Sequence, residues 1–259
     1  MNEILSRLIR KFYIELENGN KLVDKYLNYA YKVLCSIYGT PTTNFDFAYR
    51  DSDGKYHIDK NLTPKKFYDK YIGIDLLDDY VTIYSYEDEK YKYNNLYRIE
   101  ESSLIEGVKD SIVLNLKYEE IEKLMIKQLK NNEPVYINVS TTSKSVDGIW
   151  IDIMKRYGDI LNIDLKLSNN DIIKTNGTTE EHAVIITGVL IINNEIKKWK
   201  VENSWGNMVG KNGYFVVEEE FIRNYLIGIV INKKYLTNKE KELLNKKPIE
   251  VSKWDYKFC

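Results

Sequence analysis

The stretch 181–215 reads E-H-A-V-I-I-T-G-V-L-I-I-N-N-E-I-K-K-W-K-V-E-N-S-W-G-N-M-V-G-K-N-G-Y-F. The β-branched run 183–192, which follows His182, predicts a strand, and 196–201 predicts a second one. Asn193-Asn194 between them predicts a tight turn, because Asn tolerates the left-handed backbone region. The sequence therefore predicts a β-hairpin that brings the start of the first strand beside the end of the second.

This hairpin places His182 and Asn203 side by side. An imidazole takes up and releases a proton near neutral pH, and it needs a partner on its second nitrogen to fix its tautomer. An amide oxygen supplies that partner without a charge, and Trp205 is close enough in sequence to shield the hydrogen bond from water. A His/Asn pair usually serves a cysteine nucleophile, whereas a lone His at a strand start is more often a core residue.

The segment 199–215, W-K-V-E-N-S-W-G-N-M-V-G-K-N-G-Y-F, resembles the Asn-bearing signature of papain-like cysteine peptidases. Its form is closest to the bleomycin hydrolase / aminopeptidase C branch. Further segments that resemble this branch are 45–51 (F-D-F-A-Y-R-D), 62–71, 126–130 and 230–236. Together they extend over nearly all of the chain from Lys21 onward.

The resemblance implies an α+β, papain-like fold, with a helical N-terminal part and an antiparallel, β-barrel-like part that carries the site. It implies His182 and Asn203 as catalytic residues, with Ser204, Trp205 and Gly206 supporting them. In that family the C-terminal tail lies in the active-site cleft, and its carboxylate restricts cleavage to free N-termini. The implied reaction is hydrolysis of N-terminal peptide bonds, with a peptide as substrate and no cofactor.

One departure from the family pattern concerns the nucleophile. The family carries its cysteine at an early G-R-C-W-type helix start, preceded by a Gln that helps form the oxyanion hole. The present chain has only Cys35 and Cys259, and neither lies in such a segment. We therefore expect the C-terminal portion of a cysteine aminopeptidase, truncated and inactive alone. It would act with a Cys-bearing N-terminal half or as a homo-oligomer.

Two other interpretations remain open at this point. The chain is also consistent with a non-catalytic, peptidase-derived scaffold or peptide-binding module. An enzyme that uses Cys35 would need this residue to reach His182, and its place in a predicted helical stripe disfavours that. The terminal Cys259 would be poorly positioned as a nucleophile at a frayed end.

The composition argues against several classes of partner and site. The net charge of −1 gives no electrostatic reason to expect nucleic-acid or anionic-membrane partners. Two His and two Cys make a structural metal site improbable. Two cysteines far apart form no disulfide framework, and no apolar run has the length of a signal or membrane segment, so we expect a cytoplasmic protein.

The chain divides in our interpretation into a mainly helical region (1–72), a mixed and β-barrel-like region with the site (73–246) and a tail (247–259). Predicted helices are 2–38 with a break at Gly19, a short helix capped by Thr63, 117–130, 218–225 and 237–245. Residues 43–58 are predicted as an extended segment with a turn at 51–54, and the predicted strands that follow are 81–84, 113–116, 134–140, 213–217 and 227–232. Residues 87–98 are interpreted as a polar surface excursion, and 140–147 as either a wall of the substrate site or a solvated loop.

Overall fold

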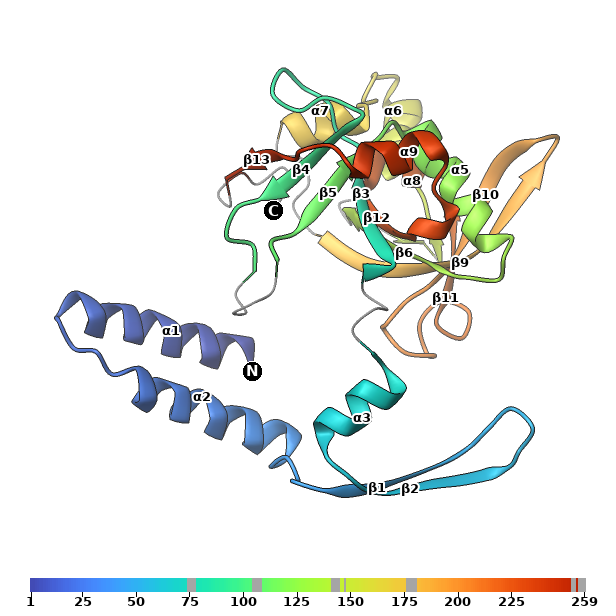
Figure 1. The fold of residues 1–259 in the computed structure, drawn as a ribbon. Helices are drawn as coiled ribbons and strands as arrows, with labels where there is room; N and C mark the ends of the chain where they lie inside the picture. Colours follow the sequence, from blue (N-terminus) through green and yellow to red (C-terminus); the bar gives the residue numbers. More distant parts are fainter. Residues whose placement is uncertain are drawn as a thin grey trace. The chain divides into compact units, whose positions relative to one another are not determined.

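The structure is a computed structural model that describes residues 1–73, 78–103, 109–140, 145–146, 148–175, 181–252 and 255, with backbone alone at 145, 146 and 181. The chain divides into two units, Met1–Ile74 (unit 1) and Asp75–Cys259 (unit 2). Figure 1 shows the elements of each unit coloured along the chain.

Unit 1 contains two helices followed by a hairpin and a short helix. Its elements are α1 (Asn2–Glu17), α2 (Val23–Tyr38), β1 (Phe45–Arg50), β2 (Tyr56–Leu62) and α3 (Pro64–Tyr71). The predicted break between the first two helices is confirmed, and Gly19 there adopts a φ of +80°, which glycine reaches without strain. The predicted cap is also confirmed, because the Thr63 side chain accepts a hydrogen bond from the backbone N–H of Lys66 at 3.2 Å.

The strands of unit 2 form one mixed sheet. They are β3 (Tyr80–Tyr84), β4 (Asn95–Ile99), β5 (Ile112–Asn115), β6 (Val135–Ser140), β7 (Ser145–Val146), β8 (Ile149–Trp150), β9 (Glu181–Ile192), β10 (Glu195–Glu202), β11 (Tyr214–Glu218), β12 (Leu226–Asn232) and β13 (Ile249–Val251). Across the described residues their order is β13-β4-β5-β3-β12-β6-β9-β10-β11-β8-β7. Most neighbours are antiparallel, and the parallel pairs are β13 with β4, β3 with β5, and β11 with β8.

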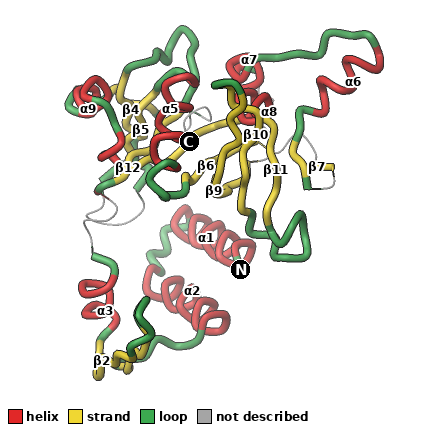
Figure 2. Tube along the Cα trace, turned by 90° about the vertical axis from the view of Figure 1, so that its right-hand side faces the viewer, coloured by secondary structure: helices red, strands yellow, loops and turns green. Residues whose placement is uncertain are grey.

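Unit 2 also contains helices, which complete the α+β architecture that the sequence predicts. They are α5 (Tyr118–Leu129), α6 (Ile153–Leu161), α7 (Asn169–Lys174), α8 (Glu219–Tyr225), η1 (Lys233–Tyr235) and α9 (Asn238–Leu244). Helix α5 contacts β6, β9 and β12, and α8 contacts β6, β10, β11 and β12. Figure 2 shows α5 close to these central strands. The predicted inward residues Ile121, Leu124 and Met125 are buried in the core.

The prediction of a surface excursion at 87–98 is wrong. Residues 95–99 form β4, and Tyr91 and Tyr97 are each only 1% exposed. Tyrosines are buried here because their hydroxyls are satisfied: Tyr97 accepts a hydrogen bond from the backbone N–H of Lys92 at 2.7 Å, and the Tyr91 hydroxyl donates to Asp255. The polar composition of 87–98 therefore gave no indication of the buried strand β4.

The first part of the tail belongs to the sheet. Strand β13 pairs in parallel with β4, and Asp255 accepts a hydrogen bond from the Lys90 ammonium at 2.6 Å. Burial, and then the neighbouring Asp255 carboxylate, raise the pKa of the Tyr91 hydroxyl above its ordinary value. Cys259 and the rest of the tail from residue 256 onward lie outside the described residues. No helix in the described part of the chain is long and apolar enough to cross a bilayer.

Candidate active site

The predicted hairpin is formed by β9 and β10. Its register runs from Ile192 opposite Glu195 to Ile185 opposite Glu202. The two turn residues, Asn193 and Asn194, have φ values of 52° and 63°, as a tight turn with two left-handed residues requires. Because the strands pair along their length, the first residues of β9 lie beside the last residues of β10.

His182 and Asn203 are brought into direct contact by this register. The His182 Nε2 atom lies 2.9 Å from Asn203 Oδ1. The same oxygen accepts the backbone N–H of Ser204 at 2.7 Å. A backbone N–H can only donate, so the Asn203 side-chain atom that faces it must be the oxygen Oδ1 rather than the nitrogen Nδ2. An amide oxygen can only accept, so Nε2 must carry the proton, and in the neutral ring Nδ1 is the basic nitrogen.

The backbone around Asn203 is fixed by the loop that follows β10. The Asn203 N–H donates to the carbonyl of Gly213 at 3.0 Å, which closes the loop between β10 and β11. Gly206 and Gly213 each adopt a φ of +86°, a region that L side chains rarely reach. The loop thus depends on glycine at these two positions, and the supporting role expected of Gly206 stays a prediction.

An aromatic cluster surrounds the His182 ring. The Trp205 ring stacks on it, with centroids 5.1 Å apart and planes inclined by 19°. Trp150 on β8 lies next to both rings, with its own ring tilted and 6.2 Å from His182 and 6.3 Å from Trp205. Phe215 on β11 contacts Trp150 at 5.5 Å and Trp205 at 5.8 Å. The cluster shields one face of the imidazole from water, while His182 itself remains half-buried.

The sequence predicted Trp205 in this cluster but missed Trp150. Two helices, α6 and α7, separate Trp150 from His182 along the chain, and its strand β8 is only two residues long, so no periodic pattern marks it. The available signal was a tryptophan in a short apolar run, Ile149-Trp150-Ile151, between a glycine and an aspartate.

The strand β6 flanks the other side of the hairpin. Val139 pairs with His182, and Ser140, which is fully buried, pairs with Glu181. The predicted substrate wall at 140–147 begins at this point, but 141–144 and 147 lie outside the described residues. Its role as a wall therefore stays a prediction.

A largely buried carboxylate, that of Glu219, lies next to β10 with its side chain 16% exposed. Glu219, at the start of α8, accepts hydrogen bonds from Trp199 Nε1 at 2.5 Å and from the Tyr118 hydroxyl at 2.9 Å. Burial raises the pKa of Glu219 to about 7, although both hydrogen bonds act in the opposite direction. Glu219 thus titrates near neutral pH inside the unit that carries the His/Asn pair.

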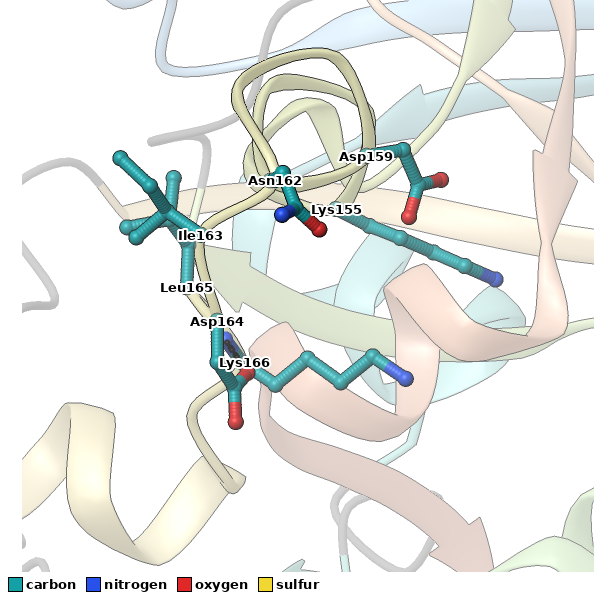
Figure 3. A pocket seen from close by; sticks show the side chains of 8 residues that line it. Lys155, Asp159, Asn162, Ile163, Asp164, Leu165 and Lys166 are labelled. Atoms are coloured by element: carbon teal, nitrogen blue, oxygen red, sulfur yellow. Dashed lines mark hydrogen bonds between the residues drawn. The ribbon is translucent and has the colours of Figure 1, made fainter.

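The hollow of about 350 Å³ shown in Figure 3 does not supply the chemistry of a catalytic site. Its lining comes from one continuous stretch, 155–166, and contains neither His nor Cys. Lys155 and Lys166 extend in the same direction in Figure 3, but the Lys155 ammonium already pairs with Glu220 at 2.7 Å. This hollow is therefore a solvated groove beside α6.

The two cysteines lie outside the described part of unit 2, since Cys35 belongs to unit 1 and Cys259 is not among the described residues. Cys35 is half-buried in the last turn of α2, in unit 1. The C-terminal end of a helix disfavours an anion such as a thiolate, whereas nucleophilic cysteines are commonly found at helix N-termini.

Comparisons with known proteins identify the family of this chain. Residues 2–257 match the Peptidase C1-like family. The chain is 35% identical to aminopeptidase G of Lactobacillus delbrueckii subsp. lactis over 92% of its length and 54% of the relative. It is 34% identical to aminopeptidase C of Lactobacillus helveticus over 98% of its length and 60% of the relative.

A solved structure, PepW from Lactobacillus rhamnosis HN001, is similar with a TM-score of 0.83 and 32% identity. The match covers 98% of this chain and 60% of that one. The chain thus spans between half and two thirds of the length of these relatives. The family match extends over almost every residue, and the papain-like α+β fold accompanies it, so the chain belongs to the Peptidase C1-like family.

Proposed function

We propose that this chain is the His- and Asn-bearing portion of a cysteine aminopeptidase of the bleomycin hydrolase / aminopeptidase C branch. The observation that carries the proposal is the 2.9 Å contact between His182 Nε2 and Asn203 Oδ1, with the amide oriented by Ser204 N–H. The names of the relatives, aminopeptidases G and C, support the reaction class. The thiol comes from a polypeptide segment that is not among the 259 residues.

In this mechanism His182 acts through Nδ1. This nitrogen removes the proton of the cysteine thiol, and the thiolate attacks the carbonyl carbon of the first peptide bond. The imidazolium that forms keeps its Nε2–H on Asn203, which stabilises the ring orientation without a second charge. The Nδ1 proton then passes to the leaving amine, and the C–N bond breaks. Water hydrolyses the acyl-thioester, with the same imidazole as base.

Reconstitution tests this proposal. The purified chain is mixed with a polypeptide corresponding to the part of Lactobacillus helveticus aminopeptidase C outside the matched 60%. Turnover of an aminoacyl fluorogenic substrate is then measured. We expect activity only in the mixture, and His182→Ala should lower it by about 10²–10⁴-fold, the usual contribution of a general base.

A matched control is available because the chain has only two histidines. His57 lies on β2 in unit 1, where it pairs with Asp51 at 2.7 Å, so His57→Gln should leave turnover unchanged. A complex that assembles, shown by sedimentation, but has no turnover would instead favour the alternative. In that case the chain is a non-catalytic peptidase-derived scaffold or peptide-binding module.

A further inference from the structure

Trp150 is a core residue that also contacts the aromatic rings of the candidate site. It is 4% exposed, and its ring lies within 6.3 Å of four other rings. These are His182, Trp205, Phe215 and Phe221. Trp150 is therefore the one aromatic residue, among those described, that touches both the catalytic candidate and the residue stacked upon it.

Trp205 alone does not fix the orientation of the imidazole. It is 50% exposed and follows β10 in a loop, so its own position depends on packing against neighbouring side chains. That support comes from Trp150 at 6.3 Å and Phe215 at 5.8 Å. Removing Trp150 would thus loosen Trp205 and open a cavity beside the His182 ring.

The backbone of Trp150 is held on both sides. It pairs with Val217 of β11 in parallel and with Ser145 of β7 antiparallel. The side chain therefore projects from a fixed strand rather than from a mobile loop. A fixed ring beside the imidazole hinders rotation of that imidazole about its Cβ–Cγ bond. A 180° rotation would place Cε1 where Nε2 now lies, and the hydrogen bond to Asn203 that fixes the tautomer would be lost.

We propose that Trp150 is a positioning residue for His182. It keeps Nε2 on the Asn203 oxygen and thereby leaves Nδ1 facing outward as the base. This inference rests on the proposed function and deepens it, because it names the residue that maintains the orientation on which the reaction depends. Trp150 does not contact the reacting atoms and acts only through the imidazole.

The test measures the tautomer of His182 directly, without requiring activity. Two-bond ¹H–¹⁵N correlation spectra of the full chain distinguish a ring protonated on Nε2 from one protonated on Nδ1. They are recorded over a pH series, and the tautomer is read on the alkaline plateau, where the ring signals no longer change with pH. The variant His57→Gln assigns the two histidine signals.

We expect wild type to show the Nε2–H form. Trp150→Leu should populate the Nδ1–H form and make exchange of the Nε2 proton with water about threefold to tenfold faster, as loss of an aromatic contact permits. Trp150→Phe, a milder change that protects against misfolding, should shift both readouts in the same direction by less. The control Trp199→Leu removes another buried indole, one that bonds Glu219, and should leave the His182 tautomer unchanged.

The outcomes separate this inference from the proposed function. Wild type with the Nδ1–H form would overturn the His/Asn geometry and with it the proposed function. Wild type with the Nε2–H form, unaltered by both Trp150 variants, would overturn only the positioning role. An equal shift in Trp199→Leu would show that any core defect disturbs the ring, and would also overturn that role.

Discussion

At the scale of single residues, the sequence identified the central pair and missed its support. His182 and Asn203 are predictable because a turn with two asparagines fixes the hairpin register that joins them. Trp150 and Glu219 are not predictable in this way. Their contacts with His182 and Trp199 come from elements distant along the chain, and only tertiary packing brings them together.

Glu219 gives a pH-dependent stability whose sign is fixed by its environment. Burial raises its pKa from 4.5 to about 7. Between these values the folded chain retains a proton that the unfolded chain has released, so the free energy of unfolding falls as pH rises from about 4.5 to 7. Glu219→Gln, which stays neutral, should flatten this part of the profile.

Urea denaturation at several pH values measures this effect. The neighbouring Glu220, which pairs with Lys155 at the surface, supplies the control, and Glu220→Gln should keep the wild-type slope. A Glu219→Gln profile as steep as wild type would show that the buried carboxylate does not titrate in this range.

At the scale of elements, amphipathic periodicity and capping residues predicted helices correctly. A strand with polar composition could not be predicted in the same way. Helix α5 and the Thr63 cap follow from local signals. Strand β4 was missed because its buried tyrosines look polar in sequence, while their hydroxyls are satisfied within the fold. Helix α7 is six residues long, which is too few residues to show a helical periodicity in the sequence.

The β9–β10 turn gives the clearest prediction for an element. Asn193 and Asn194 both have positive φ. Replacing both with Val should cost about 1–2 kcal/mol for each residue, because a branched side chain clashes in the left-handed region. Replacing both with Gly should leave stability close to wild type.

The free energy of unfolding, measured with urea, separates these cases. Lys197→Val is the matched control, since Lys197 is exposed on the same hairpin and has no positive φ. Equal stability of the Val-Val and Gly-Gly variants would contradict the assigned turn.

At the scale of the whole molecule, the two units differ in how much they bury. The hydrophobic core residues gather in the sheet and helices of unit 2, whereas α1 and α2 contain no buried side chain. The sequence predicts that these helices form, because amphipathic spacing is a local signal. It does not tell what covers their apolar faces, because that depends on surfaces far from them in sequence or outside the chain.

Limited proteolysis of the native chain should therefore begin in unit 1. Segments with few buried contacts open most readily, and cleavage follows the population of the open form. We expect early cuts before about residue 75 and a resistant fragment that retains β9 and β10, identified by mass spectrometry. First cuts within 181–232 would contradict this view of the two units.

The central claim is that the chain contributes His182 and Asn203 to a cysteine peptidase site but no nucleophile. It is tested most directly by assaying the purified chain alone on an aminoacyl fluorogenic substrate. An irreversible thiol-directed inhibitor is added and its adducts are mapped by mass spectrometry. We predict no turnover and no selective adduct. Turnover that stops when Cys35 or Cys259 is modified would contradict the account and make that cysteine the partner of His182.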